Sequence, residues 1–308
     1  MGRQGAATRL PGEKTSRRRA SESRDSSTLI SPRRLPSVSL VAPSPLITLL
    51  TDFGTADYFS GAMKGVILTL SPAAQIIDIS HEISPQDVSA AAFVLLASYR
   101  SFPPGTIHVA VVDPGVGSSR RAILVAAGGH LFVGPDNGIF SYICDRHADY
   151  RVIKLTNEKY FCRPISATFH GRDIFAPVAA ALSRGVELEE FGPEIKDEIR
   201  LRSLAPRRLT DSKLEARIIH IDRFGNCITN LTPDDLPFDR PGGRPQLRVN
   251  GKTVKSFRRF FSEEGSKEKL FGIWGSAGFL ELAAANSSAA KILHAKPGEK
   301  VIVKIAGD

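Results

Sequence analysis

Residues 107–112 form an apolar run rich in Val, Ile and Ala that ends at Asp113 and a turn with two glycines. Such a run is typical of a strand buried on both faces in a sheet covered by helices. Ligands of open parallel sheets collect beyond the carboxyl ends of the strands, where Asp113 would lie. Gly115 and Gly117 let the backbone approach a ligand, and Arg120 returns a cation toward the acid. An ordinary strand exit, with Asp113 capping its own loop, explains these residues equally well.

The segments around this run alternate between strand-like and helix-like patterns, which predicts an α/β N-terminal domain with a mostly parallel sheet flanked by helices. Ser84 is predicted as a helix N-cap, with Pro85 at the first helical position. A hairpin is expected across Gly128 and Gly129. The expected strands are 46–50, 75–79, 107–112, 122–127 and 130–133, and the expected helices are 58–70, 88–99 and 174–182.

Beyond residue 205 the pattern changes to short strands separated by Gly and Pro turns, which predicts a small β-rich domain resembling a barrel or sandwich. The predicted domains are therefore 46–205, with the α/β fold, and 206–308, rich in β-strands. The strands expected in the second domain are 214–221, 227–231, 246–249, 270–274, 279–283 and 300–305.

Residues 1–45 are rich in Ser, Arg, Pro and Gly and poor in large apolar residues, so we expect a disordered basic tail. They hold nine Lys or Arg against three acids, which leaves only +3 of the net charge of +9 for the rest of the chain. A nucleic-acid partner for the folded part thereby loses its main support. The Arg and Ser content also resembles an organelle-targeting segment, although the three acids count against this.

Other compartments and chemistries are disfavoured by features that the sequence lacks. No apolar run reaches the roughly 18 residues that span a bilayer, so we expect a soluble, cytoplasmic protein without a membrane partner. The three cysteines have no metal-ligand spacing, which favours a reducing compartment. The phosphate-binding loop, the dinucleotide-binding glycine pattern, the HExxH zinc motif and the GxSxG nucleophile elbow are all missing from the sequence.

Polar residues in glycine-punctuated loops at predicted strand ends are the candidates for function. They are Asp52, Asp113, His170 with Arg172 and Asp173, and Asp222 with Asn226. Each has a structural explanation: Asp52 or Asp222 as a turn acid, Asn226 as a left-handed residue, Arg120 as a surface charge and Asp173 as a helix N-cap. His170 lies between Phe169 and Gly171, an unusual place for a core histidine, but its imidazole can also serve only to tie loops together.

Six short motifs occur in an order that resembles a known family. They are Thr51-Asp52-Phe53-Gly54, Val112-Asp113-Pro114-Gly115-Val116-Gly117 with Arg120-Arg121, Pro135-Asp136-Asn137-Gly138, Thr168-Phe169-His170-Gly171-Arg172-Asp173-Ile174-Phe175, Asp222-Arg223-Phe224-Gly225-Asn226 and Gly275-Ser276. With them, residues 46–308 resemble the S-adenosyl-L-methionine (SAM) hydroxide adenosyltransferase family, which is related to SAM-dependent fluorinases and chlorinases. The resemblance implies an α/β domain, a β-rich domain and a homotrimer with substrate sites between subunits.

The resemblance also implies roles for individual residues. Asp113, Arg120 and His170 match the positions that handle the attacking water, and Asp52 matches the residue that holds the ribose hydroxyls. Further positions that match substrate contacts are Asp222, Phe224, Asn226, Ser276, Glu281 and Ala284, the last through its backbone. The segment around Asn286 departs from the family, whose usual Asn falls one residue earlier, so a contact from Asn286 stays open.

The implied reaction is attack of water or hydroxide on the ribose 5′ carbon of SAM, which releases adenosine and L-methionine. SAM is then the substrate, and neither a cofactor nor a metal is expected. Methionine leaves the sulfonium as a neutral thioether and needs no acid, so the weak nucleophile is the difficulty. Arg120 and His170 can favour an anionic oxygen, and Asp113 can orient the water or the imidazole.

Two other functions stay open. A SAM-dependent halogenase would carry a long insertion between the arginine loop and the Pro135 turn and would lack the acid and the histidine. The short segment 121–135, Asp113 and His170 disfavour that function. A non-catalytic SAM or adenosine sensor would need Asp52 and Asn226 but not the Asp113, Arg120 and His170 set.

Overall fold

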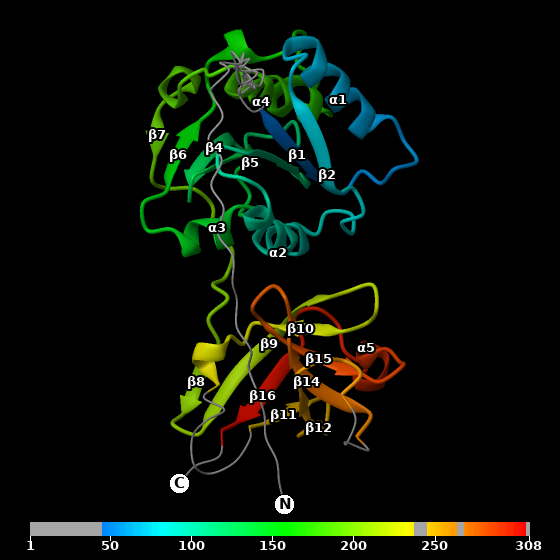
Figure 1. Ribbon diagram of the computed structural model, residues 1–308. Helices are drawn as coiled ribbons and strands as arrows, with labels where there is room; N and C mark the ends of the chain where they lie inside the picture. The colour runs from blue at the N-terminus through cyan, green and yellow to red at the C-terminus, as the bar shows by residue number, and fades with distance from the viewer. Residues whose placement is uncertain (1–44, 237–244, 264–267, 306–308) are drawn as a thin grey trace, which may run out of the picture. The chain divides into compact units, whose positions relative to one another are not determined.

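The computed structural model describes residues 45–236, 245–263 and 268–305, which form two β-sheets joined by one stretch of chain (Figure 1). The basic tail predicted to be disordered lies outside the described residues, except for its last residue, Pro45. The domain boundary predicted at residues 205 and 206 and the location of the protein in the cell stay predictions.

The first sheet combines parallel and antiparallel strands. Its strands are β1 (Leu46–Thr51), β2 (Gln75–Ser80), β3 (Ile107–Val111), β4 (Ala122–Ala127), β5 (His130–Pro135), β6 (Arg151–Lys154) and β7 (Glu194–Ile195). They lie in the order β2-β1-β3-β5-β4-β6-β7. The pairs β2–β1, β1–β3 and β3–β5 are parallel, whereas β5–β4, β4–β6 and β6–β7 are antiparallel.

The prediction of a mostly parallel sheet is therefore wrong, because only one half of the sheet is parallel. The predicted hairpin across Gly128 and Gly129 is confirmed, and it is the physical reason for the difference. A tight hairpin joins antiparallel strands, so β4 runs against β5, and β6 and β7 then continue the antiparallel half. The half β2-β1-β3-β5 is parallel, as predicted for the sheet as a whole.

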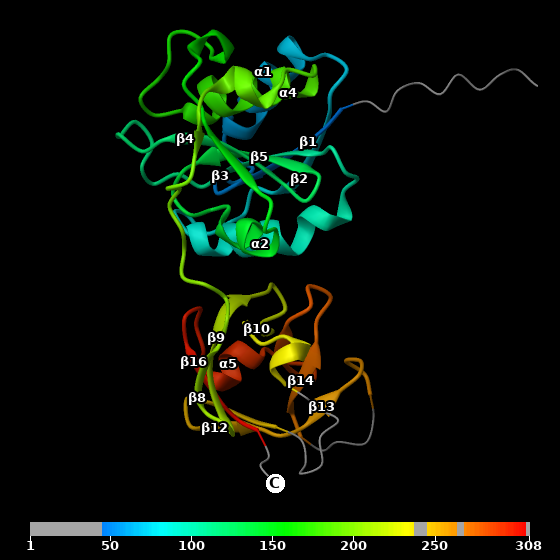
Figure 2. The same ribbon diagram turned by 90° about the vertical axis from the view of Figure 1, so that its left-hand side faces the viewer.

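Helices cover both faces of the first sheet (Figures 1 and 2). They are α1 (Phe59–Leu70), α2 (Val88–Ser98), α3 (Ser141–Arg146) and α4 (Ala176–Ser183). Neighbouring residues of a strand point to opposite faces, so Leu49 packs in the core beneath α1 and α4, and Leu50 in the core beneath α2 and α3. Among the described residues, no helix has the length and apolar composition needed to cross a bilayer.

The start of α2 differs from the prediction. Asp87, and not Ser84, is its N-cap, and the Asp87 carboxylate accepts a hydrogen bond from the Ala90 N–H at 2.8 Å. Gln86 adopts a left-handed conformation with φ of 66°, and its N–H donates to Asp52 Oδ2 at 2.8 Å. The residues after Ser84 therefore form a turn held by Asp52, and this tertiary contact delays the helix.

The second sheet curls around an apolar core of its own (Figure 2). Its strands are β8 (Arg207–Thr210), β9 (Lys213–Ile221), β10 (Cys227–Thr229), β11 (Gln246–Val249), β12 (Lys252–Val254), β13 (Phe257–Arg258), β14 (Leu270–Trp274), β15 (Leu280–Ala284) and β16 (Lys300–Lys304). They follow the order β12-β11-β16-β9-β10-β15-β14-β13, and β8 pairs with β9. A short helix, α5 (Ala289–Leu293), adds Ala289 and Leu293 to the core. The predicted β-rich character is confirmed.

Candidate active site

Two of the predicted acids lie at the same edge of the first sheet. Asp52 directly follows β1 and Asp113 follows β3, and these strands are parallel neighbours in which Thr51 faces Val111. The carboxyl ends of parallel neighbours meet at one edge of the sheet, and this is the kind of strand end at which the sequence predicted Asp113. Asp52 Oδ2 accepts the Gln86 N–H, while Oδ1 has no hydrogen-bond partner in the part of the chain that the structure describes. One oxygen of Asp52 is thus available to a ligand.

Asp113 and Arg120 form a bidentate ion pair across their loop. Arg120 Nε donates to Asp113 Oδ1 at 2.9 Å, and Arg120 Nη2 donates to Asp113 Oδ2. The two side chains are only 5% and 9% exposed, so Arg120 is not a surface charge. The Phe175 ring lies 5.3 Å from the guanidinium carbon and covers it. Two parallel hydrogen bonds in a poorly solvated place define the orientation of the guanidinium.

His170 joins this pair through Arg120. Its Nδ1 lies 2.9 Å from Arg120 Nη2. A guanidinium group only donates, so Nδ1 accepts and the neutral ring carries its proton on Nε2. Burial, followed by the positive charge of Arg120, lowers the pKa of His170, and the opposing effects of Asp113 and Asp173 are smaller. His170 is therefore a neutral imidazole near pH 7 that presents an Nε2–H donor.

Gly117 makes the approach of the two site loops possible. Its φ is +77°, a conformation that residues with a side chain rarely adopt. A Cβ atom at this position would overlap the carbonyl oxygen of Ala167, which lies three residues before His170. The loop that carries Asp113 and Arg120 thus packs backbone to backbone against the loop that carries His170.

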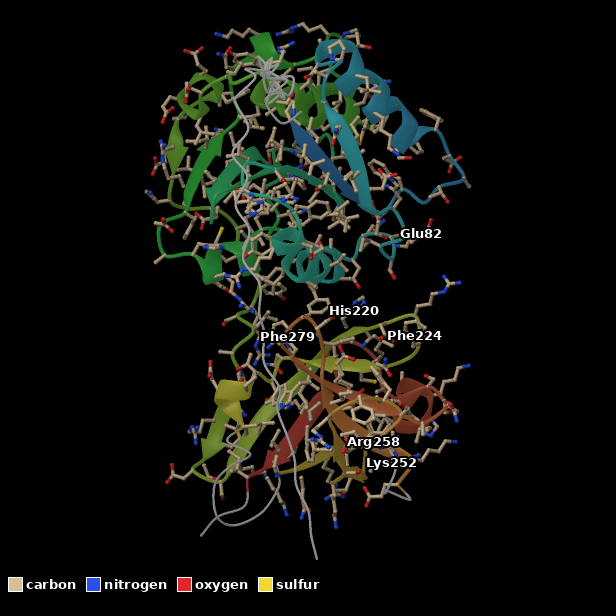
Figure 3. The ribbon with its side chains drawn as sticks, in the orientation of Figure 1. Glu82, His220, Phe224, Lys252, Arg258 and Phe279 are labelled. Carbon is tan, nitrogen blue, oxygen red and sulfur yellow. The ribbon has the colours of Figure 1, made fainter. Side chains whose placement is uncertain are left out.

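The next predicted residues lie in the turn between β9 and β10. Asn226 donates from its backbone N–H to Asp222 Oδ1 at 2.8 Å and from Nδ2 to Asp222 Oδ2 at 2.9 Å. Asp222 therefore closes this turn, and the left-handed residue of the turn is Gly225, not Asn226. Phe224, at the tip of the turn, is 80% exposed (Figure 3). An aromatic ring held outside the core in a closed turn is suited to contact another molecule.

The other predicted residues of the second sheet lie on or beside β15. A Cβ atom at Gly275 would overlap the carboxylate of Glu281, so Glu281 lies directly beside the Gly275-Ser276 turn. Burial, and then the negative charge of Asp222, raises the pKa of Glu281. Ala284 ends β15. Glu281 is thus a partly buried acid between the β9–β10 turn and the Gly275 turn.

The structure therefore separates the predicted residues into two groups. The first-sheet group is Asp52, Asp113, Arg120 and His170, and the second-sheet group is Asp222, Phe224, Asn226, Ser276, Glu281 and Ala284. Within the described ranges, no hydrogen bond or ion pair joins one group to the other.

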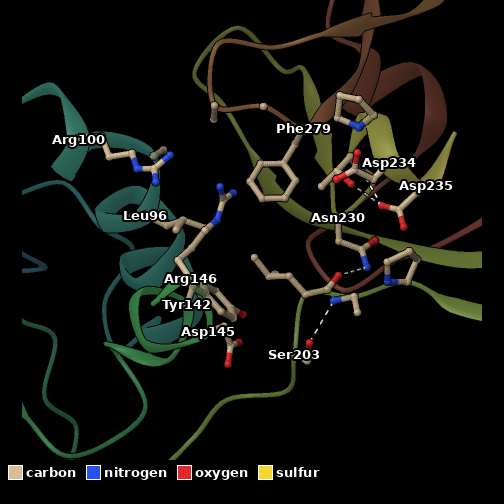
Figure 4. A pocket seen from close by; sticks show the side chains of 18 of the residues that line it. Leu96, Arg100, Tyr142, Asp145, Arg146, Ser203, Asn230, Asp234, Asp235 and Phe279 are labelled. Atoms are coloured by element: carbon tan, nitrogen blue, oxygen red, sulfur yellow. Dashed lines mark hydrogen bonds between the residues drawn. The ribbon is translucent and has the colours of Figure 1, made fainter. Parts of the chain in front are cut away.

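Three members of the second-sheet group line three different pockets. Ser276 lines a pocket of about 740 Å³ whose walls also include Arg146 and Phe279 (Figure 4). Asp222 lines a pocket of about 890 Å³, and Ala284 lines one of about 410 Å³ together with Asn286. None of these three pockets includes a residue of the first-sheet group.

Sequence reasoning missed the residue that supports the loop of Asp52. His81, which is 5% exposed, contacts Thr51 Oγ1 through its Nδ1 at 2.8 Å. The carbonyl of His81 accepts the Gly54 N–H at 2.7 Å, so His81 binds the loop on both sides of Asp52. The available signal was a histidine directly after β2, at the same edge of the parallel strands. In the described ranges no group of three or more His, Cys, Asp or Glu is arranged to hold a metal ion.

Comparisons with known proteins agree along most of the chain. Residues 47–192 match the family model described as the SAM hydroxide adenosyltransferase N-terminal domain, and residues 216–302 match the model of its C-terminal domain. A curated protein of Methanocaldococcus jannaschii named (R)-S-adenosyl-L-methionine hydrolase is 38% identical over 265 residues, covering 81% of this chain and 92% of that protein. A protein of the same name from Salinispora tropica is 36% identical, covering 85% of this chain and 99% of its own length.

Solved structures and halogenating relatives complete the comparison. A crystal structure of an uncharacterized conserved protein from Thermotoga maritima is 34% identical with a TM-score of 0.77, and the match covers 84% of this chain and 99% of that one. A fluorinase of an Actinoplanes species is more distant, at 26% identity over 84% of this chain and 97% of that protein.

Proposed function

Because this chain belongs to the SAM hydroxide adenosyltransferase family, it is an enzyme that hydrolyses SAM, and we propose that water or hydroxide attacks the ribose 5′ carbon to give adenosine and L-methionine. The observation that supports this route is the hydrogen-bonded cluster of Asp113, Arg120 and His170, in which the acid and the arginine are almost fully buried and the histidine is half-buried. It combines a cation, a neutral imidazole N–H and a carboxylate at the strand edge where ligands collect.

The hydrogen bonds of the cluster suggest how the nucleophile is handled. The Nδ1 lone pair of His170 is already occupied by Arg120, so the ring is placed to donate from Nε2 and not to remove a proton there. Arg120 and His170 then stabilise the negative charge of hydroxide, and poor solvation strengthens both interactions. Asp113 holds Arg120 in place. Since methionine departs as a neutral thioether, we propose that the reaction needs no metal or resident cofactor.

The two groups of residues support a division between chemistry and binding. Asp52 Oδ1 is available to accept a hydrogen bond from a ribose hydroxyl, since its other oxygen is engaged by Gln86. We assign contacts with the adenosyl and methionyl parts of SAM to the second-sheet group. Exposed Phe224 can cover apolar ligand surface, whereas Glu281 can accept hydrogen bonds from amine or hydroxyl groups.

We also propose a homotrimer whose sites lie between subunits. Within the described residues no hydrogen bond, ion pair or pocket considered above joins the two groups, which supports this arrangement, because a substrate that needs both groups can then be bound by two chains. Mixing Asp113→Ala protein with Asn226→Ala protein tests the idea after the subunits have been allowed to exchange. If the two proteins are mixed in equal amounts and sites are shared between chains, about one quarter of the parent activity should return. This is the fraction of sites that combine an intact first-sheet group with an intact second-sheet group. No regain in verified mixed trimers contradicts shared sites.

The alternative functions predict different products. Residues 121–135 are almost wholly used by the β4–β5 hairpin, which leaves no room for the insertion expected of a halogenase. A non-catalytic sensor can bind SAM without the cluster of Asp113, Arg120 and His170, so the presence of this cluster favours an enzyme.

Incubation of purified protein with SAM, in buffers with and without chloride or fluoride, separates these functions by chromatography. Adenosine and methionine in equal amounts are expected in every buffer. A 5′-halogenated adenosine identifies a halogenase, and intact bound SAM identifies a sensor.

A further inference from the structure

The Pro135-Asp136-Asn137-Gly138 turn has no role in the chemistry described so far, yet it contacts the backbone at Asp113. Asn137 Nδ2 donates to the carbonyl oxygen of Val112 at 2.8 Å, one residue before Asp113. Asn137 Oδ1 accepts the Ile139 N–H at 3.2 Å, which holds the amide in this orientation. A side chain following β5 thus supports the chain as it leaves β3.

The position of Val112 explains why an amide is needed there. The ladder between β3 and β5 ends at Val109 and Val133, and the ladder between β1 and β3 ends at Thr51 and Val111. The Val112 carbonyl lies beyond both ladders, and the residue is fully buried. A buried backbone carbonyl without a partner is costly, and Asn137 supplies the donor that the sheet no longer provides.

The same turn also supports the other end of the ion pair. Asp136 is 1% exposed, and its Oδ2 accepts from Arg121 Nε at 2.7 Å. The Asp136 N–H donates to the carbonyl of Arg121 at 2.9 Å, and this carbonyl also accepts from Arg120 Nη1 at 3.2 Å. One turn therefore holds the backbone before Asp113 and the carbonyl that orients Arg120.

We propose that Asn137 is a positioning residue for the hydrolysis, holding Asp113 at the distance and angle at which it orients Arg120 and His170. The proposal rests on the function assigned above to these three residues. Asn137 itself touches no reacting atom, so its effect falls on the rate of the chemical step and not on SAM binding.

The test is steady-state kinetics of Asn137→Ala in the full-length protein, with SAM as substrate. We expect kcat to fall by roughly 10- to 100-fold, since a small misplacement of a catalytic group has effects of this size. KM should stay within about twofold of the parent value. Asn157→Ala is a matched control: Asn157 Nδ2 donates to the Glu190 carbonyl at 2.7 Å and Oδ1 accepts the Lys159 N–H at 3.4 Å, away from the cluster.

A second variant keeps the test decisive if Asn137→Ala does not fold. Asn137→Asp retains an oxygen for the Ile139 N–H but loses the donor to Val112, and it should show the same loss of kcat. A kcat within twofold of the parent, or equal losses in the Asn137 and Asn157 variants, overturns the positioning role. A parent protein that releases no adenosine overturns the proposed function instead.

Discussion

The first-sheet and second-sheet groups of candidate residues differ in how completely the chain holds them. Asp113, Arg120 and His170 are linked to one another by hydrogen bonds, and the Asp113 and Arg120 side chains are almost fully buried. In the second-sheet group, the side chains of Asp222 and Asn226 bind each other and Asn226 is buried, but Phe224 is 80% exposed. The chain therefore preorganises the first-sheet group, whereas the second-sheet group combines a preformed turn with an exposed aromatic ring.

This difference has a physical explanation in the proposed reaction. Groups that stabilise a transition state are most effective when they are already oriented and poorly solvated. Groups that bind an outer part of a substrate can remain exposed until the ligand or another subunit covers them. The contrast predicts that changes in the first-sheet group reduce the rate, whereas changes in the second-sheet group reduce affinity.

The largest effect is expected from Asp113→Asn, which keeps the shape of the side chain and removes its charge. Arg120 then loses its partner, and we expect kcat to fall roughly 10²- to 10³-fold, equivalent to about 2.7–4 kcal/mol, with little change in SAM affinity. His170→Ala should act in the same direction. Single-turnover kinetics and calorimetric SAM binding measure the two quantities separately.

Glu194→Gln is the control for this change, since Glu194 pairs with Arg151 at 2.9 Å and lies outside the three pockets, with its side chain 32% exposed. It should leave both the rate and the affinity at parent values. Turnover at the parent rate in both Asp113→Asn and His170→Ala contradicts the assignment of the first-sheet group to water handling.

A somewhat smaller loss is expected from Gly117→Ala. The added Cβ overlaps the Ala167 carbonyl and pushes the Asp113 loop away from the His170 loop, so kcat should fall by roughly 10- to 100-fold. Gly105→Ala is the matched control, because Gly105 has φ of +84° but no atom within 4 Å of its Cβ position. Equal kinetic losses in the two variants would attribute the effect to backbone conformation alone.

The free energy of unfolding should fall in acid because of His108, a buried histidine on β3. Burial, and then the charge of His130, lowers the pKa of His108 to about 3. Below pH 6.5 the unfolded chain binds a proton that the folded chain does not, so this histidine lowers the free energy of unfolding by about 1.4 kcal/mol per pH unit as the pH falls toward 3. Above pH 6.5 His108 is neutral in both states and adds no pH dependence to the free energy of unfolding.

Urea unfolding of the parent and of His108→Gln between pH 7.5 and 5 measures this contribution as a difference in slope. His294→Gln, at an exposed position after α5, should keep the slope of the parent. Identical pH dependence in the parent and His108→Gln argues against a buried neutral imidazole at this position.

The smallest effect on stability is expected from Phe224→Ala. The ring is 80% exposed, so the free energy of unfolding should change by no more than about 0.5 kcal/mol. The affinity for SAM should nevertheless fall, because the ring then no longer covers the ligand. Phe260→Ala, which removes another exposed ring, should leave both quantities unchanged. Parent affinity in Phe224→Ala removes this residue from the proposed site.

Much of the parallel half of the first sheet and of the second sheet was accessible from local sequence. Apolar runs and Gly or Pro turns predicted β1 and β3 within one residue of their observed ends, and the hairpin of β4 and β5 at its turn. The sequence could not reveal how β4 joins the sheet, because hydrophobic patterning shows that a strand is buried but not which neighbour it pairs with or in which direction. The sheet is half antiparallel because β4 pairs with β5 and β6, and β6 with β7, in opposite directions.

Local sequence is sufficient to place Asp52 and Asp113 at strand ends, because each follows an apolar run that forms a buried strand. Tertiary packing is needed for Arg120 to bridge Asp113 and His170, which lie 57 positions apart in the chain. It is also needed for Asp52 to hold the turn before α2 and for Asn137 to support Val112. These contacts join groups that are distant in the sequence, either two side chains or a side chain and the backbone. Their geometry depends on how the sheet edges and loops pack, and no local pattern of residues encodes that packing.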